Sequence, residues 1–146
     1  MRLHRFILFV VTAVAVISCS KGGGAGDPGG GNGGGHINNP SDTAAPSLVI
    51  NTPAENQVFS NGSVINVTGR ITDNAGLYRG HIRIINDANG TVVKEQLYEI
   101  HGLRAYNFNV SHTASVSVAS DYTVTVWFED HGYNSATLSV KIKVNP

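Results

Sequence analysis

The chain has 146 residues, no net formal charge, only 14 % charged residues and 17 glycines. A nearly neutral chain without a basic run has no electrostatic field that would attract nucleic acid, so nucleic-acid binding is not expected. A single cysteine cannot form an internal disulfide, so any folded domain must obtain its stability from its core.

Residues 1–18 have the composition of an export signal. Arg2 and Arg5 precede the apolar run FILFVVTAVAVI, which is too short to span a bilayer comfortably. The alternative is a buried N-terminal helix or strand, but no downstream segment has the pattern of a helix against which it could pack. Removal of this signal leaves eight basic and ten acidic residues, a net charge of −2.

The tetrapeptide V-I-S-C, residues 16–19, resembles the lipobox of bacterial lipoproteins. The resemblance implies cleavage before Cys19, lipidation of its sulfur and acylation of its new amine; a thiolate is the nucleophile that alkylation needs. Several acyl chains hold a protein firmly on a membrane. The serine at position 20 implies an outer-membrane lipoprotein, and periplasm-facing and surface-exposed placements both stay open. The alternative for Cys19 is a buried thiol or half of an intermolecular disulfide.

Residues 19–46 are predicted to be the lipidated cysteine and a flexible, disordered glycine-rich linker. Glycine loses much backbone entropy on ordering, and this segment has little apolar surface to bury in return. Its reach is on the order of 25–30 Å for roughly 26 residues. No strand precedes the glycines and no GK[S/T] follows, so a phosphate-binding loop is not expected. The tripeptide D-T-A at 42–44 resembles an O-glycosylation site of Bacteroidetes, which makes Thr43 a candidate for modification.

Residues 47–146 change to a period of two and predict an all-β domain. β-Branched residues are frequent, no amphipathic helical stretch occurs, and turn-forming tripeptides separate the apolar runs. About a hundred residues of short antiparallel strands predict a seven-stranded immunoglobulin-like β-sandwich. The predicted strands cover 47–52, 63–72, 78–86, 91–99, 104–111, 122–129 and 136–144.

The segment SDYTVTVWFEDHGYNSATLSVKIKV, residues 120–144, resembles the closing strands of bacterial Ig-like domains. Residues 53–84 resemble their opening strands, including a D-x-x-G turn at 73–76. The whole arrangement is similar to uncharacterised Ig-like lipoproteins of Bacteroidetes. The resemblance places Tyr122 at a tyrosine corner, with its hydroxyl bonded to upstream backbone.

Alternation along the strands predicts one outward face with candidate ligand-binding residues. With Tyr122, Val124, Val126 and Phe128 inward, Trp127 points outward. The neighbouring strands are expected to place His81, Arg83 and Lys141 around it, while Ile82, Ile84, Leu138, Val140, Ile142 and Val144 point inward. Such a face suits a glycan or a protein partner. Alternatively, the stems of Lys141 and Arg83 cover the indole and no ligand binds.

Oxygen-bearing side chains are expected to gather at one end of the sandwich. Asp73 and Asn74 follow the second predicted strand, and Glu129 and Asp130 end the sixth. Calcium prefers six to eight such ligands, so these four residues are the candidate metal ligands. The alternative is that each Asp accepts N–H groups of its own turn, with no cofactor at all.

The combined prediction is a membrane-anchored, exported, non-enzymatic Ig-like domain that binds a glycan or a protein partner. The alternative is a structural accessory subunit of an outer-membrane complex, whose sandwich edge pairs with a partner strand. No nucleophile elbow or paired-carboxylate motif indicates catalysis.

Overall fold

The computed structural model describes residues 38–146, and these residues form eight strands and no helix. The predicted export signal, Cys19 and the linker as far as residue 37 lie outside the described residues. Nothing in the described part of the chain is a helix long and apolar enough to cross a membrane. The strands are β1 (Ser47–Thr52), β2 (Gln57–Ser60), β3 (Val64–Thr72), β4 (Leu77–Asn86), β5 (Val92–Glu99), β6 (Ala105–Thr113), β7 (Ser120–Asp130) and β8 (Ser135–Asn145).

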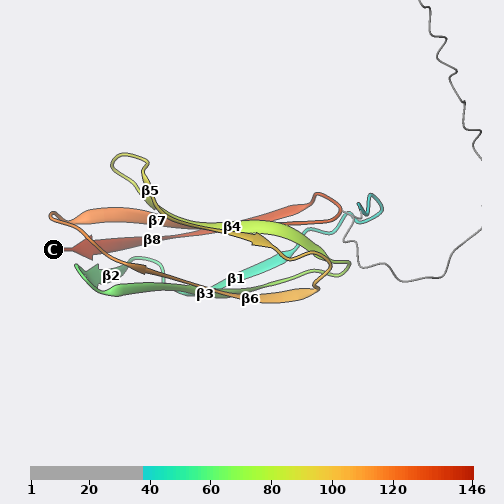
Figure 1. Cartoon of the computed structure of the whole chain (residues 1–146), viewed down its shortest axis with the longest axis horizontal. Coiled ribbons are helices and arrows are strands. Elements are labelled where there is room, and N and C mark those ends of the chain that lie inside the picture. Colours follow the sequence, from blue (N-terminus) through green and yellow to red (C-terminus); the bar gives the residue numbers. More distant parts are fainter. Residues whose placement is uncertain (1–37) are drawn as a thin grey trace, which may run out of the picture. The chain divides into compact units, whose positions relative to one another are not determined.

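The strands form two sheets that lie as two layers (Figure 1). One sheet has the order β1-β3-β6 and the other has the order β2-β8-β7-β4-β5. All pairs are antiparallel except β2 with β8, which is parallel. Because β4, β7 and β8 lie side by side opposite the β3–β6 pair, the arrangement is that of an immunoglobulin-like β-sandwich. The predicted fold class is confirmed in this respect.

The predicted number of strands is wrong by one. Residues 57–60 form β2, although the sequence predicted a turn and connection there. The strand has only four residues, and a positive φ of 61° at Asn56 precedes it. Its pairing partner is β8, more than 80 residues further along the chain. A strand this short, defined by so distant a partner, has no local periodicity that could predict it.

The predicted inward positions of β4 and β7 are confirmed. Ile82 and Ile84 are fully buried, and so are the alternate positions of β7 from Val124 to Phe128. The ring of Tyr122 is also buried, but its hydroxyl makes no hydrogen bond within residues 38–146, so the expected tyrosine corner is not formed there.

The inward face of β8 is buried only towards its end. Ile142 and Val144 belong to the core, Val140 packs against it, and Leu138 is 41 % exposed. Strand β2 pairs with β8 only over Ile142–Asn145, so Leu138 lies where β8 is the edge of its sheet. Leu138 is paired with the buried Val126 and therefore points to the inner face as predicted, but it stays partly exposed because this edge of the sandwich is incompletely covered.

Two phenylalanine rings from opposite sheets meet in the core. The ring centroids of Phe108 in β6 and Phe128 in β7 are 5.9 Å apart, with an interplanar angle of 26°. Each ring lies against a glycine on the adjacent strand: Gly69 is paired with Phe108 and Gly80 with Phe128. A Cβ atom would lie 2.2 Å from the nearest ring carbon at either glycine. These two positions therefore need glycine because of close approach.

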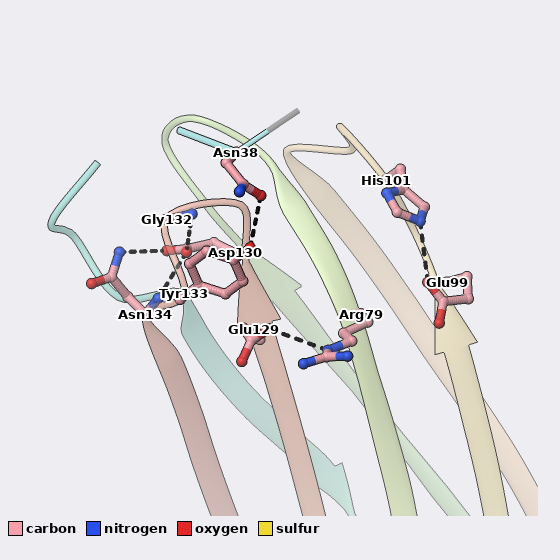
Figure 2. A network of polar contacts seen from close by, with 9 residues as sticks. All are labelled: Asn38, Arg79, Glu99, His101, Glu129, Asp130, Gly132, Tyr133 and Asn134. Atoms are coloured by element: carbon pink, nitrogen blue, oxygen red, sulfur yellow. Dashed lines mark hydrogen bonds and ion pairs between the residues drawn. The ribbon is translucent and has the colours of Figure 1, made fainter. Parts of the chain in front are cut away.

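The segment before β1 is bound to the β7–β8 loop. The backbone N–H of Asn39 donates to the carbonyl of His131 at 2.9 Å, and Asn134 Nδ2 donates to the carbonyl of Asp42 at 3.0 Å. The Tyr133 hydroxyl donates to Asn38 Oδ1 at 2.8 Å (Figure 2). Part of the segment predicted as linker is thus attached to the sandwich.

We expect Gly80→Ala to lower the free energy of unfolding by about 1–3 kcal/mol, because the added methyl group overlaps the Phe128 ring. Chemical denaturation of the purified protein measures this change. The matched control is Asn109→Ala, an exposed position of β6, for which a change within about 0.5 kcal/mol is expected. Equal stabilities of the two variants would contradict the packing described for Gly80.

Candidate functional site

A row of four side chains crosses the outer face of the five-stranded sheet. Leu97 of β5 is paired with His81 of β4, His81 with Trp127 of β7, and Trp127 with Thr137 of β8. Residues paired in this way project on the same face. The rings of His81 and Trp127 stack, with centroids 5.1 Å apart and an interplanar angle of 23°. Leu97 is 64 % exposed and Trp127 is half-buried. We call these four residues the Trp127 row.

Charged pairs lie on both sides of the Trp127 row. On one side, Arg79 Nε donates to Glu129 Oε1 at 3.1 Å (Figure 2). On the other side, Arg83 Nε donates to Glu95 Oε1 at 2.6 Å. Each charged residue lies on a strand of the Trp127 row, two residues along that strand from the member of the row, and therefore on the same face of the sheet. An aromatic and aliphatic strip is thus bordered by groups that can donate and accept hydrogen bonds.

The sequence predicted His81, Arg83 and Lys141 as neighbours of Trp127. His81 is in direct contact with it, and Arg83 lies one register step away. Lys141 is paired with Thr123, four residues along β7 from Trp127, which corresponds to about 13 Å. Its Nζ instead donates to Asp87 Oδ2 at 2.9 Å. The structure therefore places Lys141 outside the Trp127 surroundings.

Three aspartates converge at the end of the sandwich where the chain enters β1. Asp42 precedes β1, Asp73 lies in the β3–β4 turn and Asp130 ends β7; one carboxylate oxygen from each lies within 4.8 Å of the others. Asp130 is fully buried, Asp42 is 8 % exposed and Asp73 is half-buried. Two unit charges 4 Å apart near a protein surface repel by roughly 4 kcal/mol. We call these three residues the aspartate cluster.

Two of the four predicted metal ligands belong to the aspartate cluster. Asp73 and Asp130 come together as predicted from their positions at the same end of the sandwich. Glu129 and Asp130 are adjacent in a strand and therefore point to opposite faces, so Glu129 pairs with Arg79 instead. Asn74 is exposed in its turn. The sequence reasoning missed Asp42 because it assigned this residue to the linker.

The remaining candidate residues are at the N-terminal side. Thr43 is exposed in the segment before β1. Cys19 lies outside the described residues, and its lipidation remains a prediction.

No protein-family model and no curated protein matches this chain. Among solved structures, it is similar to the fibronectin(III)-like modules of Clostridium thermocellum CbhA, with 19 % identity, 69 % of this chain covered and a TM-score of 0.39. It is also similar to the CARDB domain of a Pyrococcus furiosus protein in complex with di-metal ions. That similarity has 14 % identity, covers 70 % of this chain and 93 % of that chain, and has a TM-score of 0.38. The matched part spans only 47 % of the CbhA chain.

Stability should fall on acidification because of His81. Burial, followed by the charge of Arg83, lowers the pKa of this imidazole below 6.5, with Glu95 opposing the shift. The unfolded chain therefore binds more protons than the folded chain just below pH 6.5, and stability present above that pH is lost as the pH falls. We expect the melting temperature to decrease between about pH 7.5 and about pH 5.5, and to decrease less in His81→Gln.

His112→Gln is the matched comparison. Burial and Lys94 lower the pKa of His112 in the same direction, but this residue is in the other sheet. Each single variant should remove part of the pH dependence, and the double variant should remove more than either. A pH dependence that is unchanged in His81→Gln would contradict the assignment.

Proposed function

We propose that this chain is a non-enzymatic binding module, held on a bacterial outer membrane by lipid on Cys19 and recognising a glycan through the Trp127 row. The observation that carries the proposal is the solvent-facing strip formed by Leu97, His81 and Trp127 between two rows of charged side chains. The lipobox-like tetrapeptide at residues 16–19 supports the anchor.

The shape and chemistry of the strip suit a sugar better than a protein. Four adjacent strands span three spacings of about 4.8 Å, so the row is roughly 14 Å long and one side chain wide. Aromatic rings stack on the apolar faces of sugars, while hydroxyl groups at the sugar edge need polar partners. Arg79 on one side, which is paired with the buried Glu129, and Arg83 and Glu95 on the other can provide those partners. A stable protein interface needs about 800 Å² per partner, far more than this strip offers.

A second candidate function is structural: the domain pairs with a strand of a partner subunit. Strand β5 is the outermost strand of its sheet, and among the described residues only β4 pairs with it. Its Val92 and Leu97 side chains are 45 % and 64 % exposed. A free edge with apolar side chains can accept an added strand, although Lys94 and Glu95 at its centre discourage unspecific pairing.

Substitution of Trp127 separates the two functions. We expect Trp127→Ala to weaken binding to envelope polysaccharides on a glycan array by at least about 30-fold, the effect typical of a binding hot spot. Lys141→Ala, on the same face but outside the row, is the control and should bind normally. A thermal melt of each variant shows whether it is folded. If Trp127→Ala binds like the unmodified protein, the Trp127 row is not the glycan site; preserved partner assembly would then favour the edge-strand function.

The anchor is tested in cells. Cys19→Ala should release the domain from the membrane fraction, because the lipid cannot be attached. Protease added to intact cells then reports placement of the unmodified protein: cleavage indicates the cell surface, and cleavage only after lysis indicates the periplasm. Membrane retention of Cys19→Ala equal to that of the unmodified protein would refute the lipid anchor.

A further inference from the structure

We propose that the aspartate cluster binds one calcium ion. This ion would fasten the segment before β1 to the β3–β4 turn, which contains Asp73, and to the end of β7, which contains Asp130. This site does not depend on the glycan or the lipid anchor. It differs from the ligand set predicted from sequence, since Asp42 joins Asp73 and Asp130, whereas Asn74 and Glu129 take no part.

Two of the three carboxylates accept hydrogen bonds through only one of their oxygens, and the donors are backbone N–H groups. Asp73 Oδ2 accepts from the N–H groups of Ala75 at 2.8 Å and Gly76 at 2.6 Å. Asp42 Oδ1 accepts from the N–H group of Ala44 at 3.2 Å. These short-range bonds fix the orientation of both side chains. Each carboxylate therefore presents its second oxygen in a defined direction.

The second oxygens are buried and lack a protein donor. Asp42 Oδ2 and Asp73 Oδ1 are both shielded from solvent and accept no hydrogen bond from any residue of the described part of the chain. Asp42 as a whole is only 8 % exposed. Buried polar atoms almost always have a partner, and a charged atom without one is strongly destabilising. Two such oxygens in one cluster point to a bound cation.

Asp130 completes the cluster and retains one acceptor site. Its Oδ1 accepts from the N–H groups of Gly132 at 2.7 Å and Asn134 at 2.9 Å, and its Oδ2 accepts from Asn134 Nδ2 at 3.0 Å (Figure 2). A carboxylate has about four lone-pair sites, so one on Oδ2 remains for an ion. A Cβ atom at Gly132 would lie 2.5 Å from the carbonyl oxygen of Asp42. The loop therefore packs closely against the segment that carries Asp42.

Calcium is the cation that fits these donors. All three ligands are carboxylates; with all three ionised their charge favours a multivalent cation, and hard oxygen donors are those that calcium prefers. Calcium–oxygen bonds of about 2.3–2.6 Å allow ligand oxygens up to roughly 5 Å apart around one ion, which accommodates the observed limit of 4.8 Å. Calcium takes six to eight oxygen ligands, so water molecules would supply the coordination that the three carboxylates leave open. Magnesium demands a near-ideal octahedron with bonds of about 2.0–2.1 Å, which three separate loop segments do not readily provide.

The ion would join three segments that are distant in sequence. The hydrogen bonds from Asn39 to His131 and from Asn134 to Asp42 already hold the segment before β1 against the β7–β8 loop. Without a cation, mutual repulsion of the three carboxylates opposes these bonds. When calcium is bound, the three carboxylates are attracted to the ion, and this attraction stabilises the attachment of the segment. Attachment of residues 38–46 therefore becomes dependent on calcium.

The test uses the full chain, purified in detergent and freed of metal with EDTA. Added calcium chloride should bind in a 1:1 ratio by native mass spectrometry, with a dissociation constant of about 10⁻⁴ M or below. The melting temperature should rise by on the order of 10 °C at 100-fold excess over that constant. Limited proteolysis of residues 38–46 should slow on calcium addition. Magnesium chloride at the same concentration should have much weaker effects.

Asp42→Asn should abolish the calcium-dependent rise in melting temperature, because it removes one charged ligand outside the strands. Asp121→Asn is the matched control: it removes the same charge from an exposed residue on β7 and should respond to calcium normally. A folded, unmodified protein that binds no calcium and shows no change in melting temperature or proteolysis would overturn the proposal. So would an Asp42→Asn variant that retains the full calcium response, or equal effects of magnesium.

Discussion

The contact between the Phe108 and Phe128 rings fixes the arrangement of the two sheets. The rings stack across the interior, and each can do so only because the adjacent strand has a glycine opposite it, Gly69 or Gly80. A slip of one residue in either strand pair would turn the ring or the glycine to the wrong face. The same register that buries Phe128 therefore places Trp127 on the outer surface. One core contact thus determines both the packing of the sandwich and the position of the Trp127 row.

Much of the fold could be predicted from alternation alone, but the relations between distant segments could not. The inward residues of β4 and β7 follow from period two, because each strand is long and buried on one face. Strand β2 has four residues and depends on β8, so no local signal identifies it. Alternation also identified the face on which Lys141 lies, but not its distance from Trp127, since that distance depends on the register between β7 and β8.

The aspartate cluster shows the same limit for a site. Asp73 and Asp130 were predicted to meet because each follows a strand that ends at the same end of the sandwich. Asp42 stands in a segment rich in glycine, proline and small residues, whose composition is typical of a linker. What attaches it is a set of hydrogen bonds to His131 and Asn134, almost a hundred residues away. The composition of this segment indicates only that it would be flexible in isolation. Whether it is ordered depends on its hydrogen bonds to the distant β7–β8 loop.

The attachment of residues 38–46 to the β7–β8 loop also has a mechanical consequence. A pulling force that arrives along the chain from its N-terminal side reaches the bonds at Asn39 and Asp42 before it reaches β1. The load is then shared between β1, in the three-stranded sheet, and the β7–β8 hairpin, in the five-stranded sheet. Edge strand β1 is thereby protected from being peeled from β3 one hydrogen bond at a time. Both sheets of the domain therefore resist a force that is applied through residues 38–46.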